Sequence, residues 1–247
     1  MNQMVNSRYE YVKKFEEEEK LLKDTFICVN VKTLDFDQFC IDHKFLNPFD
    51  DRIIRLNAEC ARHVMEDFTD IDISYGFMGE FSFIFKRTTA TFNRRRDKIL
   101  TNLTSLFAST FAYRWSKYFS FPIQYPPSFI STITLFPRLR IVKDYLLWRQ
   151  ELSAVECLNL YTINVLERSG KSHEESLEIV KNTNESEKNE ILFKNGINFN
   201  SLPDWHKRGK ILFREKKIYE SSDNFATKKA NFWEKHKKLL RPANSTK

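Results

Sequence analysis

Residues 71–86, IDISYGFMGEFSFIFK, have the pattern of two β-strands joined by a tight turn. Apolar and polar residues alternate in the first half, and phenylalanines recur at every second position in the second half. Gly76 and Gly79 flank the expected turn, where we expect them to allow backbone conformations with positive φ. The stretch therefore predicts a β-hairpin at the centre of the fold.

Glu80 lies where the second strand of this hairpin begins. A single carboxylate at that position is either a solvated charge at the edge of a sheet or one ligand of a divalent cation. The second interpretation requires another strand to bring a further carboxylate beside it, because divalent cations need several oxygen ligands.

The remaining elements follow from hydrophobic periodicity. Residues 25–31 form an apolar run with the length of a buried strand, and Asp35 and Asp37 introduce a short helix after it. Further helices are expected over residues 7–22, 48–68, 94–115 and 141–166, and short strands over residues 133–136 and 211–214. This order predicts an α+β fold, with helices packed on one face of an antiparallel sheet.

The composition fits a folded, basic protein of one large or two small domains. The 247 residues are 41% hydrophobic and include 23 phenylalanines, which is enough for a sizeable core. The formal net charge of +7 favours a polyanionic partner, nucleic acid first, over a basic protein without such a partner.

Other classes of protein are disfavoured. The four cysteines include no C-x-x-C pair, so neither a zinc site nor a disulfide framework is expected. No apolar run approaches the roughly 20 residues that span a bilayer, so no membrane partner is expected. The acidic residues 16–19 argue against a mitochondrial transit peptide, and we expect an intracellular protein, cytoplasmic or nuclear.

Arg94, Arg95, Arg96 and Lys98 crowd the expected start of the helix over residues 94–115. Cations at this end oppose the helix dipole, at a cost of about 0.3–1 kcal/mol each when they are exposed. Such a cluster is typical of an anion-binding site, although a solvated charge cluster would give the same pattern.

Seven short stretches carry a resemblance to a known family. They are NSRYEYV (6–12), NPFDDR (47–52), TFNRR (91–95) with Lys98, YPPSF (125–129), DYLLWRQ (144–150), KNEILF (188–193) and GINFN (196–200). In this order and with these spacings, over about residues 6–216, the chain resembles the tRNA-His guanylyltransferase family, the reverse (3′-to-5′) nucleotide polymerases.

This resemblance implies a fold and a chemistry. Family members have a polymerase-type palm with a ferredoxin-like sheet, a helical region wrapped around it, and a tetrameric assembly. They add a guanosine to the 5′ end of tRNA-His after activating that end with a nucleoside triphosphate. Two magnesium ions carry the phosphoryl chemistry. They are held by an aspartate at the end of the first palm strand and by an aspartate next to a glutamate at the central hairpin.

The sequence departs from the family at the metal-holding positions. Lys32 stands where the first aspartate is expected and Gly79 where the second is expected, so that only Glu80 matches. Lys32 also puts a positive charge where a cation would lie, and we predict that it forms an ion pair with Glu80. No catalytic residue, metal or cofactor is therefore expected.

The resemblance also implies a set of residues in regions that contact triphosphate or tRNA in the family. This set consists of Asn93, Arg94, Arg95, Lys98, Lys188, Asn189 and Asn198. We expect it to form a surface for tRNA or another RNA.

These observations leave three hypotheses. The first is a pseudoenzyme that acts as an RNA-binding or structural subunit, either homo-oligomeric or assembled with an active paralogue. The second is an active enzyme that uses Mg²⁺, GTP and ATP through relocated carboxylates, Asp35 or Asp37 with Glu80. In the third, the fold is only a scaffold for an interaction that does not involve RNA.

The expected organisation has three parts. A palm-like, catalytic-type domain with its fingers helix covers residues 1–137, and a C-terminal helical part with the last strand covers residues 138–219. Residues 220–247 are expected to form a flexible basic tail.

Overall fold

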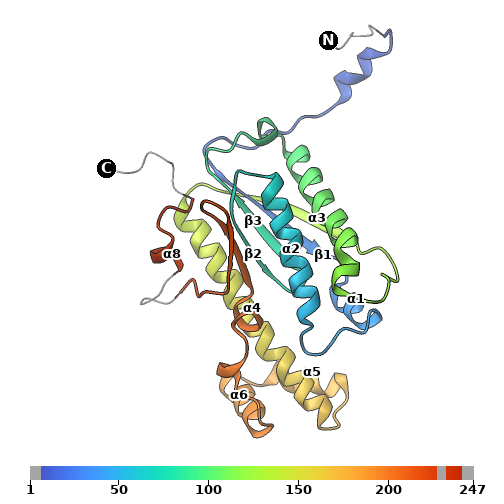
Figure 1. The fold of residues 1–247 in the computed structure, drawn as a ribbon, viewed down its shortest axis with the longest axis vertical. Helices are drawn as coiled ribbons and strands as arrows, with labels where there is room; N and C mark the ends of the chain where they lie inside the picture. Colours follow the sequence, from blue (N-terminus) through green and yellow to red (C-terminus); the bar gives the residue numbers. More distant parts are fainter. Residues whose placement is uncertain (1–6, 227–231, 241–247) are drawn as a thin grey trace.

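The computed structural model describes residues 7–226 and 232–240 and contains a six-stranded antiparallel sheet (Figure 1). The strands are β1 (Phe26–Thr33), β2 (Ile71–Phe77), β3 (Glu80–Phe85), β4 (Phe129–Phe136), β5 (Lys210–Arg214) and β6 (Ile218–Ser221). The α-helices are α1 (Phe36–Asp42), α2 (Asp51–Asp67), α3 (Arg96–Tyr118), α4 (Leu139–Arg168), α5 (His173–Asn182), α6 (Glu185–Lys194), α7 (Asp204–Arg208) and α8 (Phe232–Lys235). The 3-10 helices are η1 (Glu10–Phe15), η2 (Thr91–Arg94) and η3 (Phe199–Ser201).

The first four strands have the ferredoxin-like arrangement of a polymerase palm. β1 is followed by α1 and α2, the β2–β3 hairpin comes next, and α3 leads to β4. The strands lie in the order β4-β1-β3-β2, and β5 and β6 extend the sheet beyond β2. All neighbouring strands are antiparallel, so the predicted α+β fold is confirmed.

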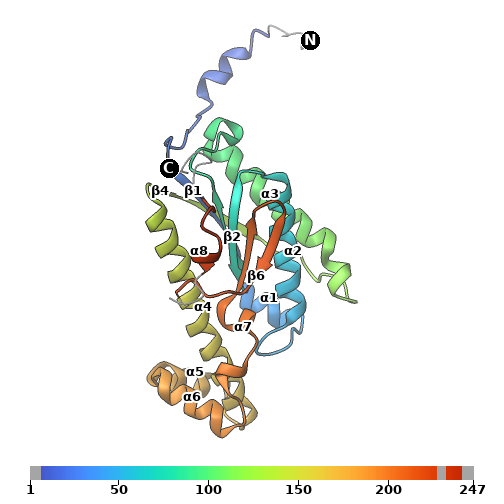
Figure 2. The same ribbon diagram turned by 60° about the vertical axis from the view of Figure 1, so that its left-hand side comes forward.

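Alternation along the strands divides the core between the two faces of the sheet. Odd-numbered residues of β1 and β3, such as Val29 and Phe83, are buried in a cluster with α2 and α3. Even-numbered residues, such as Cys28 and Ile84, belong to a second cluster with Val142 of α4. Figure 2 shows α4 crossing the face of the sheet opposite to α2 and α3. The helical C-terminal part therefore covers the face that α2 and α3 leave open.

The hairpin turn differs from the prediction in where the positive φ lies. φ is 52° at Met78, whereas Gly76 and Gly79 adopt other conformations, so the predicted role of these glycines is wrong. Packing explains them instead. A Cβ atom on Gly76 would lie 2.2 Å from the ring of Phe81, and one on Gly79 would lie 2.5 Å from the ring of Phe36. Each glycine thus makes room for an aromatic ring.

The predicted first helix is reduced to one short segment. η1 buries none of its side chains and extends away from the body of the molecule (Figure 1). No side chain caps it. A helix of this length has little stability of its own without a packing surface, which explains why the helix over residues 7–22 does not form.

Arg94 ties the segment before β1 to the body of the molecule. Its guanidinium donates hydrogen bonds to the carbonyl oxygens of Leu21, Leu22, Thr25 and Thr89. Arg94 is only 6% exposed, and this burial lowers the pKa of its guanidinium. The residue precedes α3 and does not belong to its first turn, so the predicted start of that helix is corrected.

The end of the chain contributes to the second core cluster. Phe225, Phe232 and Leu240 are buried there together with Phe213 of β5. The described part of the expected basic tail thus supplies core residues. β6 was not predicted either, and β4 is longer than the predicted strand because its polar residues pair with β1 along the edge of the sheet.

Phe232→Ala should destabilise the protein, because this ring is fully buried in the second core cluster. We expect the free energy of unfolding in chemical denaturation to fall by about 3–5 kcal/mol. Phe193→Ala is the matched control, since the Phe193 ring is 74% exposed. Unchanged stability of the Phe232 variant would contradict the packing of the C-terminal residues on the sheet.

Arg94→Lys should also destabilise the protein, because one ammonium group cannot reach the carbonyl oxygens that the guanidinium bonds from several sides. We expect a loss of about 2 kcal/mol or more in the free energy of unfolding. Arg95→Lys is the control, because the partly exposed Arg95–Glu18 ion pair contributes about 1 kcal/mol or less. Equal losses in the two variants would count against the structural role of Arg94.

Candidate functional site

The end of β1 and the start of β3 bring together the three positions that the resemblance assigns to metal binding. Lys32 and Glu80 are partners in the antiparallel ladder, and Gly79 precedes Glu80 in the turn. Strand alternation puts Lys32 and Glu80 on the face of the sheet that α4 covers. The tertiary structure therefore assembles the edge of the palm that the resemblance implies.

Glu80 forms its ion pair with Arg149 of α4. Arg149 Nη1 lies 2.8 Å from Glu80 Oε1, and the two side chains are only 15% and 24% exposed. Lys32 is exposed to solvent and forms no ion pair with Glu80, so the predicted Lys32–Glu80 ion pair is wrong. Arg149 lies within the stretch 144–150 quoted above, but the sequence alone does not indicate which strand it reaches.

Polar contacts hold α4 on this end of the sheet. The hydroxyl groups of Ser82 and Tyr145 are 2.7 Å apart, and Asn30 Nδ2 donates to Ser82 Oγ at 3.0 Å. Tyr75 donates to Ser153 Oγ at 2.9 Å. Burial raises the pKa of both tyrosines, so their phenol groups stay neutral at physiological pH. These contacts fix the helix and hence the position of the Arg149 guanidinium.

The residues at this edge do not fit two magnesium ions. Glu80 is neutralised by a guanidinium, and Lys32 supplies no ligand. Asp35 and Asp37 lie at the start of α1, and within residues 7–226 and 232–240 no three His, Cys, Asp or Glu side chains are grouped so as to hold a metal ion. An aspartate in place of Gly79 would also require a neighbouring aromatic ring to move.

A cavity of about 560 Å³ lies between α1, the residues before α2, the hairpin turn and α4. Apolar side chains line much of it, and its charged lining includes one lysine, Lys44, but several carboxylates, among them Asp37 and Glu156. Burial raises the pKa of the Glu156 carboxyl, and the nearby Asp37 raises it further. Because a triphosphate needs cationic partners, this lining does not favour one.

The basic cluster before α3 is largely used within the chain. Arg94 is buried, and Arg95 forms an ion pair with Glu18 of the acidic N-terminal segment. Asn93 and Lys98 are exposed. Arg96 is half-buried and forms ion pairs with Glu19 and Asp97. The sequence predicted an anion site from the whole cluster, but the structure leaves Lys98 as its one exposed cation among the four, with Asn93 beside the cluster.

The other members of the predicted set also have local partners. Lys188 donates to Asn159 Oδ1 at 2.9 Å, Asn189 bonds a carbonyl oxygen of its own helix, and Asn198 caps η3. Figures 1 and 2 place α6 at the opposite end of the molecule from the start of α3. Within one chain, the two halves of the predicted triphosphate or RNA site therefore do not meet.

Comparisons with known proteins agree with the fold and with the resemblance. The family model described as tRNAHis guanylyltransferase matches residues 9–137, and the Thg1 C terminal domain model matches residues 140–245. The chain is 38% identical to tRNA(His) guanylyltransferase of Schizosaccharomyces pombe over 218 residues, which are 86% of this chain and 82% of that protein. It is 35% identical to a probable tRNA(His) guanylyltransferase of Drosophila melanogaster over 249 residues, 96% of this chain and 86% of that protein.

Solved structures give the same result. The crystal structure of tRNA(His) guanylyltransferase from Saccharomyces cerevisiae superimposes with a TM-score of 0.83 at 32% identity, covering 89% of this chain and 98% of that one. A bacterial guanylyltransferase-like protein in complex with ATP shares the fold, with a TM-score of 0.76 at 18% identity and coverage of 94% and 96%. With both family models matched in order along the chain, the protein belongs to the tRNAHis guanylyltransferase family.

Proposed function

We propose that this chain is a non-catalytic member of the family, which binds RNA as a structural or adaptor subunit in the processing of tRNA 5′ ends. The names of its relatives supply the substrate class, because those proteins are guanylyltransferases for tRNA(His). The proposed role keeps the fold and the RNA partner but not the reaction.

The observation that carries this proposal is the Arg149–Glu80 ion pair at the edge of the palm. A fixed guanidinium neutralises the remaining carboxylate, and a lysine and a glycine occupy the other two metal positions. Each metal ion contributes several kcal/mol to the transition state of phosphoryl transfer, and about 1.36 kcal/mol corresponds to a tenfold change in rate. Without either ion, the reaction should fall below detection.

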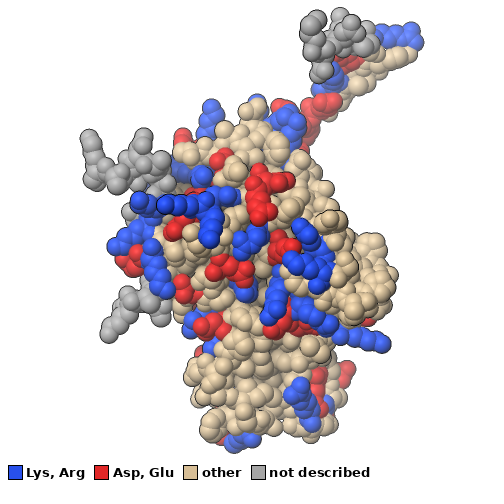
Figure 3. All heavy atoms as spheres, in the orientation of Figure 1, with Lys and Arg blue, Asp and Glu red and all other residues tan. Residues whose placement is uncertain are grey.

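An RNA partner is supported by the net charge of +7. The charge is not continuous on the face shown in Figure 3, where Lys and Arg side chains are interspersed with Asp and Glu. Binding would therefore rest on local basic sites and not on a whole face. The subunit would assemble with copies of itself or with an active paralogue, since related chains can share one type of interface.

The alternative is an active nucleotidyltransferase that uses Mg²⁺, ATP and GTP through relocated carboxylates. One observation favours it, since Asp37 and Glu156 line the same cavity beside the hairpin turn. Under this alternative, Asp35 or Asp37 would have to act together with Glu80 in holding the metal.

Incubation with tRNA, ATP, labelled GTP and magnesium separates the two functions. We expect no label at the tRNA 5′ end, because the palm edge lacks the ligands for both metal ions. The guanylyltransferase of S. pombe, 38% identical to this chain, serves as the positive control under the same conditions. Label at the 5′ end of the tRNA above the level of a no-protein blank would contradict the non-catalytic proposal and support the alternative.

Arg149→Met should destabilise the protein by about 3 kcal/mol, because it leaves the largely buried Glu80 carboxylate without a partner. In chemical denaturation, the double variant Glu80→Gln/Arg149→Met should lose at least about 1 kcal/mol less than the two single variants together. Lys32→Met is the control and should change stability by less than about 0.5 kcal/mol. A larger loss for the Lys32 variant than for the Arg149 variant would mean that the lysine is the true partner of Glu80.

A further inference from the structure

A second cavity, of about 460 Å³, lies at the end of the sheet remote from the palm edge. It is formed by the segment before β1, the loop after β3 and the residues of η2. β1 has 8 residues and rises by about 3.3 Å per residue, so this cavity is on the order of 25 Å from Lys32 and Glu80. It is therefore separate from the candidate active site of the palm.

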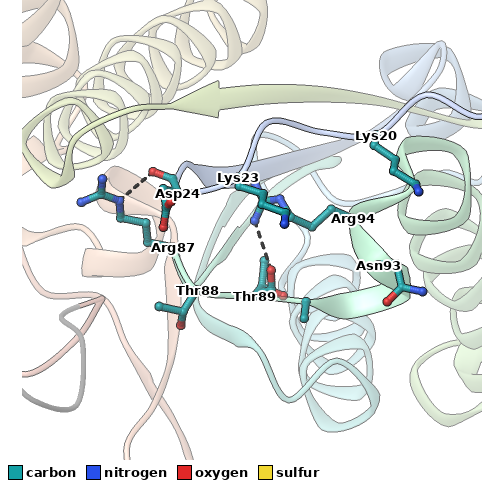
Figure 4. Close-up of a pocket in the computed structure, with 9 residues that line it drawn as sticks. Lys20, Lys23, Asp24, Arg87, Thr88, Thr89, Asn93 and Arg94 are labelled. Atoms are coloured by element: carbon teal, nitrogen blue, oxygen red, sulfur yellow. Dashed lines mark hydrogen bonds between the residues drawn. The ribbon is translucent and has the colours of Figure 1, made fainter.

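Four cationic side chains line this cavity against a single carboxylate, that of Asp24. The cations are Lys20, Lys23, Arg87 and Arg94. Figure 4 shows Lys20 and Arg87 toward opposite ends of the cavity, with Lys23 and Arg94 between them in this view. A concentration of one sign of charge in a concave site is the usual arrangement for binding an ion of the opposite sign.

These cations differ from neighbouring arginines, which form ion pairs with nearby glutamates. Arg95 pairs with Glu18 and Arg96 with Glu19, a few residues away. In contrast, none of the four cations of the cavity forms an ion pair with a residue in the described ranges 7–226 and 232–240. Arg87 instead donates to the carbonyl oxygen of Asp24 at 2.6 Å, which positions its guanidinium at the cavity.

Arg94 supplies a buried charge to this cavity. Its hydrogen bonds go to carbonyl and hydroxyl oxygens, which are neutral, and the 6% exposed side chain forms no ion pair with a described residue. The Asp24 carboxylate, which lines the same cavity, offsets part of its positive charge. A charge in a low-dielectric environment acts more strongly on a ligand than one in water. Because its N–H donors already form hydrogen bonds within the chain, Arg94 would attract an anion only through its electrostatic field. Direct contacts with the anion would come from Lys20, Lys23 and Arg87.

We propose that this cavity is a phosphate-binding site, in which Lys20, Lys23 and Arg87 contact the phosphate oxygens beside the buried charge of Arg94. Its volume lies within the range of about 300–1,000 Å³ that is usual for ligand pockets. The phosphate belongs either to the backbone of a bound RNA or to the oligophosphate of a nucleotide. The RNA source rests on the function proposed above, whereas the phosphate site itself does not.

The test uses the full chain with the charge reversals Lys20→Glu and Lys23→Glu combined. Both lysines are exposed, so the variant should fold, which circular dichroism and thermal unfolding would verify. The matched control is Lys171→Glu with Lys181→Glu, two exposed lysines at the α5 end of the molecule that change the net charge equally. Binding of labelled tRNA is measured by fluorescence anisotropy at several salt concentrations, and binding of inorganic tripolyphosphate by calorimetry.

We expect the cavity variant to lose tripolyphosphate binding and to bind tRNA at least about 10-fold more weakly than the wild type. The slope of log K for tRNA binding against log salt concentration should become shallower by about 1–2, as expected when one or two phosphate contacts are lost. The control variant should keep tripolyphosphate binding and most of its tRNA affinity.

The remaining outcomes separate this inference from the proposed function. Loss of tripolyphosphate binding with unchanged tRNA affinity supports the site and assigns it to a nucleotide. If the wild type binds tripolyphosphate but not tRNA, and the cavity variant loses tripolyphosphate binding, the phosphate site is supported and the proposed RNA-binding function is contradicted. Three results would overturn the phosphate site. Binding of tripolyphosphate and tRNA could be unchanged in the cavity variant, could be reduced equally in both variants, or could be absent from the wild type.

Discussion

The antiparallel pairing of β1 with β3 is the constraint on which the rest of the structure depends. Its register places Lys32 opposite Glu80 and determines which side chains of the two central strands face α2 and α3 and which face α4. A shift by one residue would exchange the two core clusters and move Glu80 away from α4. The packing of both faces and the composition of the palm edge are therefore set by one register.

At the palm edge, a guanidinium from a helix distant in sequence pairs with the carboxylate at the position where the resemblance implies a metal ligand. Arg149 reaches Glu80 because α4 lies across this face of the sheet, where Tyr145 and Ser153 hydrogen-bond to β3 and β2. An internal ion pair satisfies the carboxylate permanently, whereas a metal ion would leave coordination positions open for a substrate. Under the proposed non-catalytic function, the fold keeps its stability at this edge without a reactive centre.

The basic residues serve two different purposes that look alike in the sequence. Arg94 donates its hydrogen bonds to backbone carbonyl oxygens and Arg95 forms an ion pair with a glutamate, so both stabilise the chain itself. Lys20 and Lys23 form no ion pair with any residue that the structure describes, and they line a cavity together with the buried Arg94. A cation in a structural role can therefore also prepare a binding site for an anion.

The sequence by itself determined the central hairpin and the α+β class, and the family resemblance put Lys32 and Gly79 where metal-binding aspartates are expected. These features depend on local alternation and on residue identity at fixed positions of the family pattern. Only the tertiary structure decided that Arg149, and not Lys32, neutralises Glu80, that Met78 carries the positive φ, and that the C-terminal segment completes the core. Each of these depends on contacts between segments far apart in the chain, or on the space that neighbouring side chains leave, and neither is encoded in a local pattern.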